Sequence, residues 1–257
     1  MSNALEIDLI PVLRDNYVHI VREPASGAVA IVDPSVADPV VAALEARGLA
    51  PDLILCTHHH PDHVGGVPGL RRHYRAQVVA PAAERQRIGT ADRWVDEGDE
   101  IAFGGTTARV IAIPGHTAGH IAFHFSREKV LFCGDTLFSL GCGRLFEGTA
   151  DEMWHSLLKI RALDPATRIC CAHEYTEANG RFALSLEPGN AALVERMREV
   201  AALRRAGRPT VPTRLDRECA TNPFLRPESP EIRRRLGLEE ADDVAVFAEI
   251  RRRKDRF

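Results

Sequence analysis

Short apolar runs alternate with amphipathic stretches along the first two thirds of the chain. Runs rich in β-branched residues and bounded by glycine, proline or aspartate predict strands, whereas apolar residues at helical spacing predict helices. The expected strands are residues 5–10, 17–22, 28–33, 53–56, 77–80, 100–103, 106–113, 120–125, 129–133 and 168–172. The expected helices are residues 37–47, a segment after Gly65-Gly66, residues 151–163, and most of the chain after residue 172. Two β-rich sets of this kind indicate two sheets faced by helices, followed by a helical C-terminal addition.

A dense group of metal-binding side chains follows the buried strand predicted at residues 53–56. The segment Thr57-His58-His59-His60-Pro61-Asp62-His63 contains His58, His60, Asp62 and His63 within six positions. Imidazole and carboxylate ligands together suit borderline divalent cations such as zinc. A polar surface turn with surplus histidines is the alternative, but a cluster of this density at a strand end favours a metal site. Because side chains alternate along extended backbone, we expect His59 to face away from the metal and to serve in packing or a supporting hydrogen bond.

Three further strand ends carry side chains that can bind a metal. They are Pro114-Gly115-His116-Thr117, Gly134-Asp135-Thr136 and Ala172-His173-Glu174-Tyr175. Loops at strand ends are where rigid sheets present functional groups. With the first cluster these residues make seven ligands, which suits two ions. We expect His58, His60 and His116 on the first ion, Asp62, His63 and His173 on the second, and the carboxylate of Asp135 between them.

Composition narrows the class of protein. The chain of 257 residues is 45% hydrophobic and 27% charged, with a formal net charge of −3, which argues against bulk attraction to nucleic acid. Residues 191–257 have 16 Lys and Arg against 12 Asp and Glu, a net charge of +4. These basic residues can form either a solvated helix face or an anion pocket. The six cysteines, several at the ends of apolar runs, are typical of free buried thiols. No signal-like segment or membrane-spanning run is apparent, so a cytoplasmic protein is expected.

The order of these motifs resembles the metallo-β-lactamase superfamily and, within it, the hydroxyacylglutathione hydrolase (glyoxalase II) family. His-x-His-x-Asp-His, Pro-Gly-His-Thr, Gly-Asp-Thr-Leu-Phe and Ala-His-Glu-Tyr-Thr carry the superfamily resemblance. The glycine loop at residues 141–149, Thr221-Asn222-Pro223-Phe224-Leu225-Arg226 and the basic segment 251–257 carry the family resemblance. The resemblance implies an α+β fold, an αββα sandwich with a catalytic domain at residues 1–174 and a helical glutathione-binding domain at residues 175–257.

The resemblance also implies an activity. Two divalent metals, with zinc expected and iron or manganese as alternatives, would supply a bridging hydroxide that attacks the thioester of S-lactoylglutathione and related 2-hydroxyacyl thioesters. The products would be glutathione and a 2-hydroxy acid (D-lactate), as in the second step of methylglyoxal detoxification. Asp62 and Asp135 are the expected catalytic carboxylates, and Cys142 is expected to be structural because no histidine base is left for it.

Glutathione is an anion, so its pocket should offer cations and hydrogen-bond donors. The resemblance assigns this role to Arg144, Phe146, His173, Tyr175, Arg251 and Lys254. Phe146 stands where some members have an aromatic hydroxyl, so only its ring and backbone N–H are available. For Arg251 and Lys254 the alternative is a solvated helix face.

Other functions are weaker alternatives. A persulfide dioxygenase of the same fold would need fewer metal ligands than the seven present. A nucleic-acid hydrolase would need a basic stripe with interleaved aromatic residues, which this sequence does not show. A metal-dependent scaffold protein would not need an open ligand set. We therefore expect a monomer that acts on a small molecule, with no nucleic-acid or membrane partner.

Overall fold

A computed structural model describes residues 4–257. The first three residues of the expected catalytic domain, which also begin the segment where no signal peptide was recognised, lie outside the described part. The chain forms two compact units. The first contains the residues up to 112 and residues 118–134, and the second contains residues 113–117 and 135–257. The predicted domain boundary at residue 174 stays a prediction.

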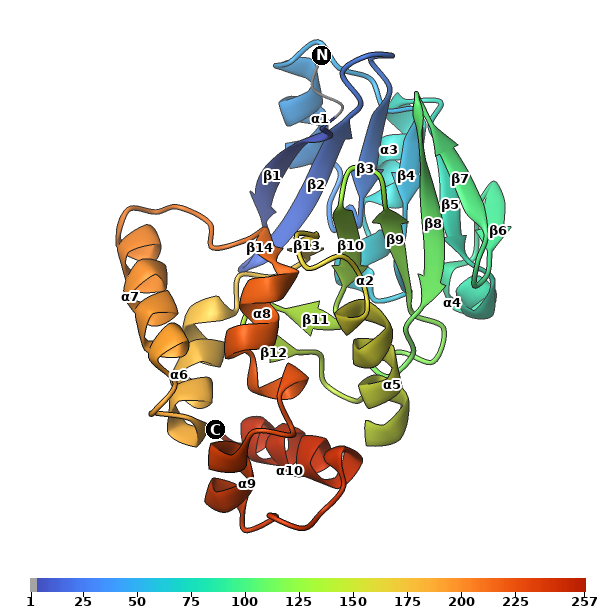
Figure 1. The fold of residues 1–257 in the computed structure, drawn as a ribbon. Coiled ribbons are helices and arrows are strands. Elements are labelled where there is room, and N and C mark those ends of the chain that lie inside the picture. Colours follow the sequence, from blue (N-terminus) through green and yellow to red (C-terminus); the bar gives the residue numbers. More distant parts are fainter. Residues whose placement is uncertain (1–3) are drawn as a thin grey trace. The chain divides into compact units, whose positions relative to one another are not determined.

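The first unit begins with a six-stranded sheet in the order β1-β2-β3-β4-β5-β6 (Figure 1). Its strands are β1 (Glu6–Val12), β2 (Asn16–Arg22), β3 (Val29–Val32), β4 (Leu53–Leu55), β5 (Gln77–Pro81) and β6 (Arg93–Val95). β1, β2 and β3 are antiparallel, and β3 to β6 are parallel. The helices α1 (Asp38–Glu45) and α3 (Val67–His73) pack their apolar sides on one face of this sheet. Strand β6 was not predicted, because Arg93, Trp94 and Val95 stand between two aspartates and form no apolar run.

A second set of strands in this unit packs against the first sheet. β7 (Glu100–Phe103), β8 (Thr106–Ala112), β9 (Ile121–Phe125) and β10 (Val130–Gly134) form an antiparallel meander. The ring of Phe132 on β10 meets the ring of His19 on β2 edge-on at 5.3 Å between centroids, so the two sheets are in contact there. Three short helical turns complete the unit: α2 (Pro61–Val64), a 3₁₀ turn at Ala82–Glu84, and α4 (Arg85–Ile88).

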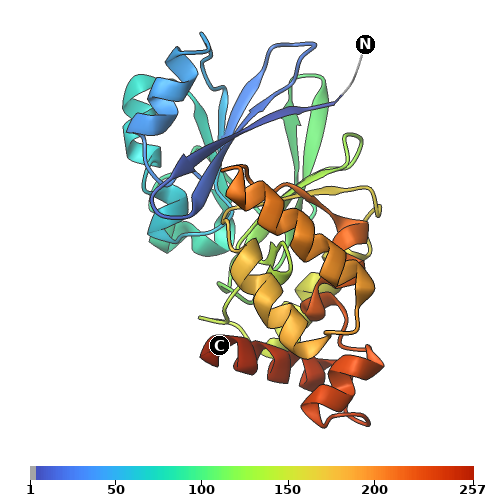
Figure 2. The same ribbon diagram turned by 90° about the vertical axis from the view of Figure 1, so that its left-hand side faces the viewer.

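The second unit is mostly helical. Its helices are α5 (Ala150–Arg161), α6 (Thr176–Leu186), α7 (Ala191–Arg205), α8 (Leu215–Thr221), α9 (Pro230–Leu236) and α10 (Asp243–Arg256), with a 3₁₀ turn at Pro223–Leu225. Figure 2 shows α6 beside α7 and the C-terminus at the end of α10. Helix α5 begins with a capping box, in which Thr149 accepts from the backbone N–H of Glu152 while the Glu152 carboxylate accepts from the Thr149 N–H.

Three short strands of the second unit, β11 (Leu137–Phe138), β12 (Gly141–Cys142) and β14 (Thr213–Arg214), were not expected. β11 and β12 form a tight hairpin, and β13 (Arg168–Cys171) pairs with β14. The sequence predicted only β13 and a helical tail after it. The other short strands exist because of the partners they find, and two residues hold no periodicity to detect. None of the helices among residues 4–257 has the length and apolarity needed to cross a membrane.

Candidate metal site

The histidine cluster in the first unit follows β4, as predicted, and its side chains converge. His58 is fully buried, and its Nε2 lies 3.0 Å from Nδ1 of His60. The Oγ1 of Thr57 lies 3.0 Å from Nδ1 of His58, and the ring of His120 stacks on the His58 ring at 4.5 Å between centroids. The ring of His58 is therefore held from two sides.

The next pair of predicted ligands lies on α2. His63 is fully buried, and its Nε2 lies 3.7 Å from Oδ2 of Asp62. The Nδ2 of Asn16, at the start of β2, donates to the same Oδ2 at 3.0 Å, and Ser35 donates to the Asp62 carbonyl. Proline at the first position of α2 suits a short helix here, because its missing N–H would have no partner in the first turn.

Asp33 organises this half of the site, and sequence reasoning did not single it out. Its carboxylate accepts from the backbone N–H and the hydroxyl of Thr57, both at 2.8 Å, and it lies 3.0 Å from Nδ1 of His63. Asp33 is 2% exposed and has a left-handed φ of 50°. The available signal was a carboxylate at the end of the predicted strand 28–33, which resembles the signal that pointed to Asp135.

His59 lies in a different environment from its neighbours. Its Nδ1 contacts the buried carboxylate of Glu84, and its Nε2 lies 3.1 Å from Nη1 of Arg87. The other oxygen of Glu84 accepts from the N–H of Gly119 at 2.9 Å. Both ring nitrogens of His59 thus contact protein groups, as expected for a supporting residue.

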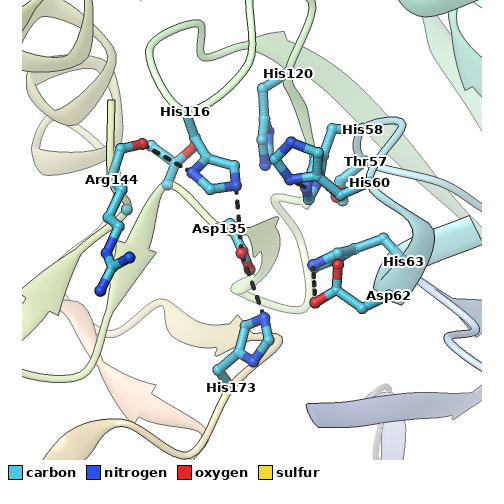
Figure 3. Close-up of polar contacts among 12 residues, drawn as sticks. Thr57, His58, His60, Asp62, His63, His116, His120, Asp135, Arg144 and His173 are labelled. Atoms are coloured by element: carbon cyan, nitrogen blue, oxygen red, sulfur yellow. Dashed lines mark hydrogen bonds and ion pairs between the residues drawn. The ribbon is translucent and has the colours of Figure 1, made fainter. Parts of the chain in front are cut away.

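The second unit brings three predicted ligands together. The Oδ2 of Asp135 lies 3.5 Å from Nε2 of His116 and 3.3 Å from Nε2 of His173. Figure 3 shows the Asp135 carboxylate between these two rings. All three side chains are buried. The Nδ1 of His116 donates to the carbonyl of Arg144 at 2.9 Å, which directs Nε2 toward Asp135.

Three of the predicted substrate-binding residues lie next to these ligands in the second unit. The exposed ring of Phe146 is 5.2 Å from that of His116. The ring of Tyr175 stacks on His173 with a centroid separation of 4.6 Å and an interplanar angle of 6°. Arg144, on the glycine loop, contributes its carbonyl to His116.

Arg251 and Lys254 are not on a solvated helix face. Arg251 is 5% exposed, and its Nη1 and Nη2 donate at 2.8 Å to the carbonyl of Cys142 and to Asp255. Lys254 is half-buried, with Nζ 5.5 Å from the ring centroid of Phe182 and 5.6 Å from that of Phe257. Burial, together with the charges of Arg251, Arg181 and Arg144, lowers the pKa of Lys254. Burial and the neighbouring positive charges therefore disfavour the charged form of Lys254, which a bound anion would stabilise.

Cys142, the thiol nearest the site in sequence, is inert. It is buried, and its burial raises its pKa to about 11. A thiol with this pKa is almost entirely protonated at neutral pH and is a poor nucleophile.

Comparisons with known proteins agree with this arrangement of motifs. Residues 13–173 match the family model of the metallo-β-lactamase superfamily, and residues 174–257 match that of the hydroxyacylglutathione hydrolase C-terminus. The hydroxyacylglutathione hydrolase of Methylococcus capsulatus is 58% identical over 253 residues, which cover 98% of this chain and 99% of that protein.

Solved structures share the fold. The BLEG-1 B3 metallo-β-lactamase aligns with a TM-score of 0.66 and 23% identity over 86% of this chain and all of that one. TTHA1623 in a di-iron-bound form aligns with a TM-score of 0.54 and 26% identity over 65% of this chain and 91% of that one. The expected metallo-β-lactamase fold with a helical C-terminal region is confirmed. The chain belongs to the hydroxyacylglutathione hydrolase (glyoxalase II) family of the metallo-β-lactamase superfamily.

Proposed function

We propose that the protein hydrolyses S-lactoylglutathione and related S-2-hydroxyacylglutathione thioesters to glutathione and a 2-hydroxy acid, D-lactate in the first case. One observation carries the proposal: the seven His and Asp side chains occur in the family's order in a chain that aligns over 98% of its length with a hydroxyacylglutathione hydrolase. The same relatives do not favour the persulfide dioxygenase alternative.

The donor atoms of the chain fit two divalent cations. Three of the proposed ligand histidines have Nδ1 in contact with a protein oxygen: Thr57 Oγ1 for His58, Asp33 for His63 and the Arg144 carbonyl for His116. Such contacts set the ring orientation and direct Nε2 toward a metal. Nitrogen and carboxylate ligands suit zinc, with iron or manganese as alternatives; TTHA1623 has been solved in a di-iron-bound form.

We assign the proposed ligands to two ions that share one carboxylate. His58, His60 and His116 would hold the first, and Asp62, His63 and His173 the second. Asp135 would serve both, because its Oδ2 already faces the Nε2 atoms of His116 and His173. When bound, the two cations supply a nucleophilic hydroxide at neutral pH and polarise the thioester carbonyl.

The side chains around the proposed ions would orient the ligands and neutralise the positive charge. Asp62 and Asp135 offset the positive charge of the metals, and the hydrogen bond from Asn16 fixes the oxygen of Asp62. The leaving thiolate is stable without a strong protein acid, so no further proton donor is required. Cys142 stays a thiol and takes no part in bond formation.

Glutathione would bind in the second unit. Lys254 is the side chain best suited to one of its carboxylates, because burial and three arginine charges lower its pKa and an anion would offset both effects. Tyr175, stacked on His173, and the ring and backbone of Phe146 would line the thioester end. Arg251 would act by holding the Cys142 carbonyl as well as by its charge.

We also propose that the protein acts as a monomer in the cytoplasm. The six cysteines are free thiols and five of them are buried, which suits a reducing compartment.

The decisive experiment is a hydrolysis assay on protein of measured metal content. S-lactoylglutathione, a β-lactam and glutathione persulfide would be compared under identical conditions. Turnover of the thioester alone is the expected result. Persulfide oxidation without thioester hydrolysis would reject the proposal.

A further inference from the structure

The hairpin of β11 and β12 packs against a buried carboxyl group of the C-terminal helical region. Glu218 of α8 is fully buried. Its Oε2 accepts from the N–H of Leu140 at 2.7 Å, and its Oε1 accepts from the hydroxyls of Thr213 at 2.8 Å and Ser139 at 3.2 Å. These hydrogen bonds offset part of the cost of burying the carboxyl group.

Asn222, four residues later, forms hydrogen bonds with both strands of the same hairpin. Its Nδ2 lies 3.1 Å from the carbonyl of Phe138 on β11, 3.0 Å from the carbonyl of Gly141 on β12, and 3.1 Å from Oε2 of Glu218. Phe138 and Gly141 face each other across the hairpin, so one amide group ties its two strands at the turn.

The turn itself is in an unfavourable conformation. Leu140 has φ of 59°, a left-handed value that is unfavourable for a residue with a side chain. Such a residue persists when its surroundings impose the conformation. Here Glu218 accepts from its N–H, and its side chain packs in a small core with Ala183 and Leu193.

This hairpin follows the proposed ligand Asp135 in the chain and packs against the proposed ligand His173. Asp135 lies two residues before β11, and Gly143, directly after β12, donates its N–H to the carbonyl of Thr136 at 3.1 Å. The ring of Phe138 meets the rings of His173 at 5.8 Å and of Tyr175 at 5.2 Å. A shift of the hairpin would therefore move Asp135 relative to His173.

We propose that Glu218 and Asn222 are positioning residues that hold the β11–β12 hairpin and thereby fix the Asp135 carboxylate between the rings of His116 and His173. The inference rests on the proposed function, in which these three residues are metal ligands. It gives the C-terminal helical region a task beyond substrate binding, namely to set the geometry of the metal site.

The test compares two buried carboxylates of the same region. Glu187 is 3% exposed and accepts from Arg226, Ser229 and Asn190, but none of these residues belongs to the hairpin. Glu187→Ala is therefore a control for the loss of a buried, hydrogen-bonded carboxylate. The test variants are Glu218→Ala, Asn222→Ala and the conservative Glu218→Gln, which keeps an acceptor for the Leu140 N–H.

Each variant would be purified as the metal-loaded full chain and also with cobalt(II) in place of the native metal. Bound metal per chain, the cobalt(II) absorption spectrum, kcat, KM and Tm would be measured. We expect Glu218→Ala and Asn222→Ala to change the cobalt(II) spectrum and to lose about 10-fold or more in metal affinity or kcat. Glu218→Gln should restore most of this loss. Glu187→Ala should lower Tm comparably while it keeps the wild-type spectrum and a kcat within about twofold.

Wild-type spectra, metal content and kcat in Asn222→Ala and in whichever Glu218 variants fold would overturn the inference, as would equal losses in the Glu187 control. A failure of the proposed function is distinguishable, because the wild-type protein itself would then not hydrolyse the thioester. The spectroscopic comparison would still report on the position of Asp135.

Discussion

Gly143 passes so close to Asp135 that no side chain fits between them. A Cβ added at Gly143 would lie 1.9 Å from the backbone oxygen of Asp135 and 3.2 Å from Nδ1 of His116, whereas ordinary contacts begin at 3.4 Å. Gly143→Ala must therefore displace the backbone by about 1.5 Å, and no flexible side-chain end is available to yield to the oxygen contact. Because Asp135 and His116 are proposed ligands, the displacement acts directly on the metal site.

The size of the effect follows from this clash. Overpacking of a closely packed region costs about 1–3 kcal/mol of folding free energy. For a chain of this length that corresponds to a fall in Tm of roughly 2–6 °C. A misplacement of about 1 Å in a catalytic arrangement costs about 100-fold in rate, so we expect kcat to fall far more than this modest loss of stability alone would cause.

Gly105→Ala is the matched control. Its added Cβ would have Glu23 as its nearest neighbour at 3.8 Å, which is ordinary contact, so Tm should stay the same or rise slightly. Thermal unfolding, metal content and thioester kinetics would be measured for both variants. A Gly143→Ala protein with the Tm, metal content and kcat of the Gly105 control would refute the reasoning, because the close approach would then constrain neither the fold nor the site.

Four further outcomes are expected. Asp135→Asn should lose one or both metals and nearly all hydrolysis, since an amide cannot serve two cations as a carboxylate does; two retained metals with normal turnover would contradict the ligand assignment. His59→Ala should keep two metals and appreciable activity, whereas His60→Ala should lose metal, and metal analysis of the pair would expose equal losses. Lys254→Ala should raise KM for the glutathione thioester more than it lowers kcat. Because the pKa of Lys254 is lowered, the wild-type KM should also rise with pH before an ordinary lysine would deprotonate, and the variant should lack that rise. Iodoacetamide at pH 8 should leave Cys142 unmodified by mass spectrometry, because its pKa of about 11 leaves roughly one thiol in 10³ ionised; rapid alkylation there would disprove this.

Much of the site was predictable because its side chains follow local rules. His58, Asp135 and His173 each stand within three residues of the end of a buried strand, so a strand pattern and a residue type were enough to select them. The separation of His59 from its neighbours was likewise predictable from backbone alternation, and its contacts with Glu84 and Arg87 agree with that prediction. The order of the motifs indicated the family, which the comparisons then established.

The contacts that support these side chains could not be found in the same way. Asp33 reaches His63 across 30 residues of chain, and Asn222 reaches Phe138 across 84. No periodicity in the sequence links residues so far apart. The burial of Arg251 was also missed, because a basic segment at a helix end looks solvated until the partner of its guanidinium, the carbonyl of Cys142, is known.

The amino-acid sequence by itself determined the types of the proposed ligands, the strands that precede them and the family, because hydrophobic period and motif spacing are properties of neighbouring residues. The tertiary structure alone decided how these ligands are oriented and held. Asp33, Asn16, Glu218 and Gly143 act through hydrogen bonds and close approaches between distant segments, and such contacts exist only once the chain has folded.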